Sequence, residues 1–202
     1  IWRSAEHEVE RWCRLLEANG IPADPRDLYL ELSDLVQTSP ILGGTIIHPG
    51  AGSPARKWPV ERWAAVARWE CQRGNRVILT GGPHEVEIAS NVAALADLPV
   101  TSILAGRTDI LELVALCAAA KRIICSDTGI AHLAVALHIP SVVLFGPMPP
   151  SHWGPPRDLR QHRALWAGMT GEPYAPSPDS GLLKISVEDV IAEILDLEKS
   201  GY

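Results

Sequence analysis

Four short segments of the chain combine small, polar and charged residues in the manner of ligand-binding turns. The first, residues 48–59, reads HPGAGSPARKWP and brings Ser53, Arg56 and Lys57 together with several glycines. Small residues let a ligand approach the backbone, and positive charge just ahead of a helix start attracts anions. The segment therefore predicts a phosphate or pyrophosphate site; the alternative is a glycine-rich turn that carries two solvated cations.

The second segment, TGGPHE at residues 80–85, follows a predicted strand and opens a predicted helix. A carboxylate at such a strand end can accept two hydrogen bonds from a ribose diol, and both Glu85 and Glu87 are candidates. The alternative is that these carboxylates complement the positive end of their own helix. The chain has no G-x-G-x-x-G fingerprint, which counts against NAD.

The third segment, SDTGIAH at residues 126–132, places polar side chains and a glycine at a helix start, where free N–H groups can bind an anion. Asp127 and Thr128 are alternatively plain N-caps, and His132 is alternatively a packed core residue. The fourth, FGPMPPSHWGP at residues 145–155, is a stiff loop with aromatic residues. It could wall a base or a sugar, or serve only as a rigid crossover.

Alternation of apolar strands and amphipathic helices must position these segments. Strands are predicted at 29–32, 45–48, 76–80, 100–104, 121–125 and 141–145, with two shorter ones near 163–166 and 182–185. Helices are predicted at 4–19, 59–73, 85–95, 109–119, 126–137 and 186–199. Ser4 and Ser186 are the predicted N-caps of the first and last helices. The pattern predicts an α/β fold with a doubly wound parallel sheet, in which ligands bind beyond the carboxyl ends of the strands.

Composition narrows the classes of function. The net charge of -6 and the pI of about 5.6 argue against a general nucleic-acid binder, which needs a basic surface. The seven histidines form no H-x-x-x-H or H-E-x-x-H pattern, so no metal site is expected. The four cysteines form no C-x-x-C pair and read as reduced thiols, which favours a cytoplasmic location. No segment is apolar for long enough to span a bilayer.

In combination and order, the four segments resemble glycosyltransferase family 9, the heptosyltransferases. The resemblance is close over residues 44–156 and looser at both ends. It implies the C-terminal, nucleotide-sugar-binding half of a GT-B enzyme that inverts the anomeric centre, needs no metal or other cofactor, and uses ADP-heptose or a similar donor.

The resemblance also assigns residues to the donor. Lys57 is expected to contact the phosphates beside Ser53, and the turn formed by Asp127, Thr128 and Gly129, continued to His132, is expected to cradle the pyrophosphate and the sugar. Nucleoside binding is expected from Gly81, Gly82 and Glu85. No catalytic residue is expected in this chain, because the family's general base, an aspartate, lies in the N-terminal acceptor domain.

The expected organisation is a linker helix and turn at 1–25, a nucleotide-sugar-binding domain at 26–185 and a C-terminal helix at 186–202, with the N-terminal domain absent. The expected partners are that domain, the nucleotide sugar and a peripheral membrane acceptor of the lipopolysaccharide type. Residues 160–182 lack the cysteines that many relatives carry, which leaves the acceptor class open. Two alternatives remain: a GT-B nucleotide-sugar epimerase, and a non-catalytic nucleotide-binding module.

Overall fold

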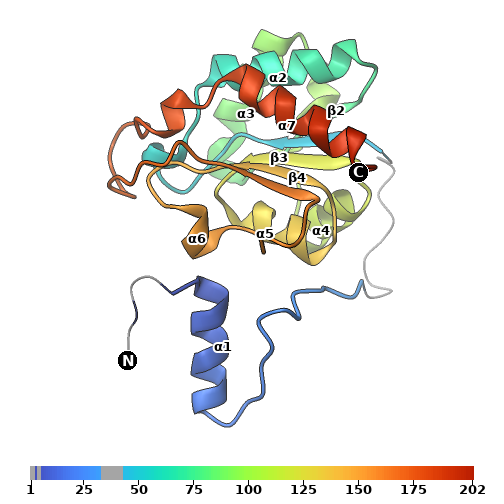
Figure 1. Ribbon diagram of the computed structural model, residues 1–202. Helices are drawn as coiled ribbons and strands as arrows, with labels where there is room; N and C mark the ends of the chain where they lie inside the picture. Colours follow the sequence, from blue (N-terminus) through green and yellow to red (C-terminus); the bar gives the residue numbers. More distant parts are fainter. Residues whose placement is uncertain (1–2, 4–5, 33–42) are drawn as a thin grey trace.

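Five parallel strands run through the centre of the molecule, with helices above and below them (Figure 1). The computed structural model describes residues 3, 6–32 and 43–202. The strands lie side by side in the order β2-β1-β3-β4-β5, and all four pairings are parallel. Their bounds are β1 Thr45–His48, β2 Val77–Leu79, β3 Arg122–Ser126, β4 Ser141–Leu144 and β5 His162–Leu165. The predicted parallel α/β sheet is confirmed.

Helices cover the sheet in two layers (Figure 1). The layer drawn above the sheet consists of α2 Val60–Gln72, α3 Val86–Ala96 and α7 Val187–Lys199. The layer drawn below it consists of α4 Ile110–Ala118, α5 Gly129–Ala136 and the short α6 Pro150–Trp153. Successive strand residues point to opposite faces, so each layer has its own apolar core. Ile47 packs in the core that contains Trp63 of α2, whereas Ile46 packs in the core that contains Ile130 of α5.

The strand predicted at 100–104 is wrong. Residues Val100–Ser102 form a 3-10 turn, η3, in which the Ser102 N–H donates to the Pro99 carbonyl (2.8 Å). Only one residue of this segment pairs with the sheet, through an isolated bridge between Ile103 and Leu79 of the edge strand β2. The tight turn after Pro99 therefore leaves too few extended residues for a strand.

The strand predicted near 182–185 is also wrong, and its apolar spacing explains why. Residues Leu182–Lys184 form a second 3-10 turn, η4. Asp179 starts it, because its Oδ1 accepts hydrogen bonds from the Gly181 and Leu182 N–H groups (2.8 and 3.0 Å). The two deeply buried side chains are Leu182 and Ile185, whose three-residue spacing suits one face of a 3-10 turn.

The N-terminal helix begins later than the sequence predicts. Helix α1 spans Glu8–Ala18 and is capped by His7, whose Nδ1 accepts from the Val9 N–H (3.3 Å). Ser4, the predicted N-cap, lies outside the described residues. By contrast, Ser186 caps α7 as predicted, since its Oγ accepts from the Asp189 N–H (3.1 Å).

Helix α1 lies apart from the two helical layers (Figure 1). It is joined to the rest of the molecule by a hydrogen bond from His7 Nε2 to the Gly154 carbonyl (2.9 Å). The segment after it, residues 29–32, was predicted as a strand but has no strand partner in the described ranges; its Leu30 N–H donates instead to the Ala136 carbonyl of α5 (2.9 Å). No helix in the described part of the chain is both long and apolar enough to cross a membrane.

Candidate functional site

The turn between β3 and α5 presents the start of a helix at the carboxyl edge of the sheet. Thr128 is the N-cap of α5 in an extended conformation, and within the described residues its side chain makes no capping hydrogen bond. The helix then begins at Gly129, where an added Cβ would meet no atom within 4 Å. Gly129 is exposed, so the start of the helix lies at an open surface, where the helix dipole favours an anion.

Arg56 lies against this turn. Its Nη1 donates to the Asp127 carbonyl (2.8 Å) and lies 3.8 Å from Asp127 Oδ2. The sequence of the loop explains the placement: Ser53 caps the 3-10 turn η1 (Pro54–Arg56), its Oγ accepting from the Ala55 N–H (3.3 Å). The turn thus places a guanidinium at the start of α5, where positive charge and helix dipole act together on an anion.

A cavity of about 430 Å³ contains the two features just described. Its walls are made by residues from the loops after β1, β3, β4 and β5: Arg56, Asp127, Thr128, Gly129, His132, Met148, Trp153, Pro173 and Tyr174. Burial raises the pKa of Asp127 above its ordinary value, and Arg56 partly opposes the rise. Burial also lowers the pKa of His132, with a smaller contribution from His7, so the imidazole is neutral at pH 7.

A second polar cluster lies one strand away, around Glu85. Its Oε2 accepts a hydrogen bond from the Gly82 N–H (2.7 Å) and lies 3.5 Å from His48 Nε2. The carboxylate packs on bare backbone: a Cβ added to Gly50 would lie 2.0 Å from Glu85 Oε1, and one added to Gly81 would lie 2.9 Å from Glu85 Cβ. Two glycines therefore let Glu85 join the loops after β1 and β2.

The structure brings together four of the predicted donor-site residues, Asp127, Thr128, Gly129 and His132, in one cavity. The three nucleoside candidates, Gly81, Gly82 and Glu85, form the separate cluster beside it. Ser53 is 2% exposed and shapes the loop. Lys57 is absent from the walls of the 430 Å³ cavity, which Arg56 lines in its place.

The sequence predicts a phosphate contact for Lys57, and the structure adds Arg56, whose guanidinium contacts the turn at Asp127. The two are adjacent, so spacing could not separate them; the 3-10 turn η1 ends at Arg56, and Lys57 is its C-cap. Tyr174, which also lines the cavity, is not among the predicted residues, and no local sequence pattern marks it. Among the described residues, no group of three or more His, Cys, Asp or Glu side chains could hold a metal ion.

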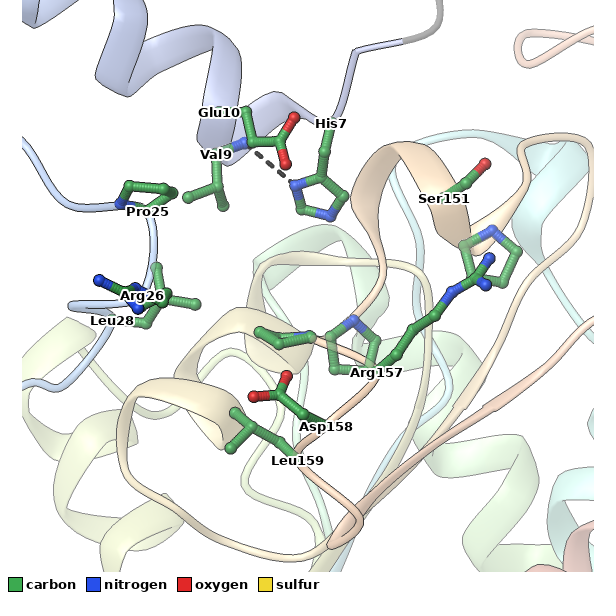
Figure 2. Close-up of a pocket in the computed structure, with 13 residues that line it drawn as sticks. His7, Val9, Glu10, Pro25, Arg26, Leu28, Ser151, Arg157, Asp158 and Leu159 are labelled. Carbon is green, nitrogen blue, oxygen red and sulfur yellow. Dashed lines mark hydrogen bonds between the residues drawn. The ribbon is translucent and has the colours of Figure 1, made fainter.

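Another cavity, of about 370 Å³, lies between the N-terminal segment and the loop after α6 (Figure 2). Its walls carry both signs of charge: Glu10 and Asp158 are acidic, and Arg26 and Arg157 are basic (Figure 2). None of the predicted site residues lines it. The mixed charge gives no net attraction for a diphosphate, so the 430 Å³ cavity is the better candidate for one.

The structure is an α/β domain in which a helix start and a guanidinium lie together at the carboxyl edge of the sheet. Comparison with known proteins identifies the protein family. The family model described as glycosyltransferase family 9 (heptosyltransferase) matches residues 2–169. The chain belongs to this family.

The relatives are lipopolysaccharide heptosyltransferases. Lipopolysaccharide heptosyltransferase 2 of Salmonella typhimurium is 34% identical over 94% of this chain and 61% of its own length. The Escherichia coli protein of the same name is 34% identical over 73% of this chain and 48% of its own length. The chain thus spans roughly half to three fifths of these relatives, and the match gives no support to the epimerase alternative.

Solved structures show the same fold. The structure of E. coli ADP-heptose lps heptosyltransferase II matches with a TM-score of 0.69 and 26% identity, over 86% of this chain and 54% of that one. A glycosyl transferase family 9 protein from Veillonella parvula matches with a TM-score of 0.78 and 21% identity, over 99% of this chain and 62% of that one. E. coli heptosyltransferase WaaC with ADP matches with a TM-score of 0.69 and 20% identity, over 96% and 58%.

Proposed function

We propose that this chain is the donor-binding part of an inverting, metal-independent heptosyltransferase, and that its donor is ADP-heptose or a closely similar nucleotide sugar. The observation that carries the proposal is the single cavity in which Arg56 and the start of α5 converge on the turn at Asp127. Family membership and the relatives' names support the choice of sugar and acceptor.

The diphosphate of the donor would lie between the Arg56 guanidinium and the first-turn N–H groups of α5. A helix N-terminus acts as roughly half a unit of positive charge, and a guanidinium adds a full charge with a fork of donors. Together they would stabilise the negative charge that develops on the departing nucleoside diphosphate, which is electrostatic catalysis by preorganised groups. Arg56 thus takes the role that the sequence assigned to Lys57, while Ser53 acts by shaping the turn.

Glu85 would hold the ribose. Its Oε2 is already engaged by the Gly82 N–H, but a carboxylate has about four acceptor positions, so Oε1 and the remaining lone pairs can take ribose hydroxyls. Gly81 and Gly82 leave room for the nucleoside beside the backbone. The ribose site then lies one strand away from the diphosphate site, in line with the covalent order of the donor.

The remaining expectations follow from the partial coverage of the relatives. The general base and the acceptor site would belong to an N-terminal domain of the same protein, with residues 1–25 as the linker and 186–202 as the terminal helix on domain 26–185. Trp12 and Leu15 of α1 are 58% and 49% exposed, which suits a linker that packs against further protein. The acceptor would be of the lipopolysaccharide type, reached from the cytoplasmic side of a membrane.

Calorimetry with ADP tests the proposal by comparing the unaltered chain with Arg56→Ala. Lys57→Ala, at the neighbouring position, is the matched control. A hydrogen bond to a charged group contributes about 1.5–3 kcal/mol, so we expect Arg56→Ala to weaken ADP binding by about tenfold or more. Lys57→Ala should change the affinity by less than about threefold, since Lys57 does not line the cavity. Absence of ADP binding by the unaltered chain, or a loss confined to Lys57→Ala, would contradict the proposal.

A further inference from the structure

Two exposed aromatic side chains line the 430 Å³ cavity. Trp58, Trp63 and Phe145 are at most 1% exposed and pack in the cores. Trp153 and Tyr174 differ from them, with exposures of 38% and 80%, and both line the cavity that holds Arg56 and Asp127. Large aromatic faces left in water at a polar cavity indicate a ligand with both polar and apolar surfaces.

The loop that carries Tyr174 is tied at both ends to the loops that follow β4 and β1. The Gly171 N–H donates to the Pro147 carbonyl and the Asp179 N–H to the Ala55 carbonyl, both at 3.0 Å. Within the loop, the Ala175 N–H donates to the Glu172 carbonyl (3.2 Å) and closes a turn around Tyr174. The backbone beneath the ring is therefore held in place before any ligand arrives, which lowers the entropic cost of binding.

The order of strands gives the position of the aromatic pair relative to the rest of the site. Across the sheet, the strands run β2, β1, β3, β4 and β5. Glu85 follows β2, Arg56 follows β1, Asp127 follows β3, Trp153 follows β4 and Tyr174 follows β5. Neighbouring strands are about 4.8 Å apart, so the first four groups are spread in that order along the carboxyl edge. The loop that carries Tyr174 returns from β5 to Pro147 and Ala55, which places Tyr174 in the same cavity as Arg56, Asp127 and Trp153.

A nucleotide sugar has a matching linear order: nucleoside, diphosphate, sugar. If Glu85 holds the ribose and Arg56 with the start of α5 holds the diphosphate, the sugar extends away from Glu85, into the part of the cavity lined by Trp153 and Tyr174. We propose that Trp153 and Tyr174 form the binding surface for the sugar ring of the donor and set its preference for a sugar nucleotide over the free nucleoside diphosphate. This inference rests on the proposed function and assigns residues to the sugar end of the same site.

The chemistry of a pyranose fits this surface. Its ring carries C–H groups on its faces, whose slightly positive hydrogens pack against the negative face of an aromatic ring. Its hydroxyls point outward, towards the polar part of the cavity around Asp127 and His132. Trp153 also lines the neighbouring cavity beneath α1, so Tyr174, which is 80% exposed, is the side chain to change without disturbing the fold.

The test compares the dissociation constants of ADP and ADP-heptose for the unaltered chain and its variants. We expect Tyr174→Ala to weaken ADP-heptose binding by about 3- to 10-fold, the range typical of an aromatic contact, and to leave ADP binding unchanged. Tyr174→Phe should keep the affinity for ADP-heptose, because it keeps the ring. Tyr202→Ala removes another exposed ring, 47% exposed, and should change neither constant.

The outcomes separate the inference from the function on which it rests. If the unaltered chain binds ADP but Tyr174→Ala leaves the ADP-heptose constant unchanged, the aromatic surface is not the sugar site and the proposed function stands. Equal weakening of ADP and ADP-heptose would place the ring on the nucleotide and would also overturn the inference. If the unaltered chain binds neither ligand, the proposed function fails, and the sugar site fails with it.

Discussion

Replacement of Gly50 by alanine should act through Glu85. A Cβ at position 50 would lie 2.0 Å from Glu85 Oε1 and 2.1 Å from its Cδ, so the carboxylate must move. The movement breaks the hydrogen bond from the Gly82 N–H to Oε2, which is 2.7 Å long. Loss of a capping bond to a partly buried carboxylate costs about 1–2 kcal/mol of unfolding free energy.

Urea denaturation of a double-mutant cycle measures this coupling. We expect Gly50→Ala and Glu85→Ala each to lower the unfolding free energy by about 1–2 kcal/mol, and the double variant to lose little more than Glu85→Ala alone. Gly52→Ala is the control in the same loop, since its added Cβ would approach only Arg56 Nη2, at 3.3 Å. If Gly50→Ala costs as much in the Glu85→Ala background as in the unaltered chain, the two residues are not coupled and the reasoning is refuted.

Three further predictions concern buried ionisable groups. Glu70→Ala should lower the unfolding free energy by about 3 kcal/mol in urea, because Glu70 is fully buried 3.8 Å from the buried Arg122 and accepts from Thr45 Oγ1 (3.1 Å); a loss below about 1 kcal/mol would contradict this. Burial, with a smaller effect of a neighbouring histidine, lowers the pKa of His162 from 6.5 to about 4, so the unfolded chain binds more protons in that interval. Stability should therefore fall as the pH drops from 6.5 to about 4, by about 3 kcal/mol for this imidazole, and chemical unfolding of His162→Gln should show a shallower fall. The pKa of Asp127 is raised above 3.8, so the folded chain holds its proton longer and stability declines as the pH rises through that raised value. Asp127→Asn should remove this decline and be more stable at pH 7; an unchanged pH profile would contradict it.

Strands β1 to β4 could be predicted because both of their faces are buried. The strand at 122–126 has three consecutive apolar residues, 123–125, at its centre and short turns on either side, which is typical of parallel sheets. Two segments that were wrongly predicted as strands, 100–104 and 182–185, are short and apolar, and their conformation depends on contacts with other parts of the molecule. Ile103 reaches the edge strand through a single bridge, and Leu182 follows a turn that the Asp179 side chain imposes. Neither contact can be predicted from the spacing of apolar residues in the local sequence.

The turn at Asp127, Thr128 and Gly129 could be predicted because it follows a buried strand directly, so its place at the carboxyl edge is fixed by topology. The contact between Arg56 and this turn could not, because it depends on the direction of the 3-10 turn η1. The position of Tyr174 in the wall of the cavity could not be predicted from the sequence either. It lies on a long loop whose path is set by hydrogen bonds to Pro147 and Ala55, far away in sequence.

A crystal structure of this chain with ADP would test most directly whether the carboxyl edge holds a diphosphate. The phosphate oxygens should lie within about 2.7–3.2 Å of the Arg56 guanidinium and of the first N–H groups of α5, with the ribose towards Glu85. Phosphates bound at Lys57 and away from Gly129, or in the cavity between α1 and Arg157, would contradict the proposed donor site.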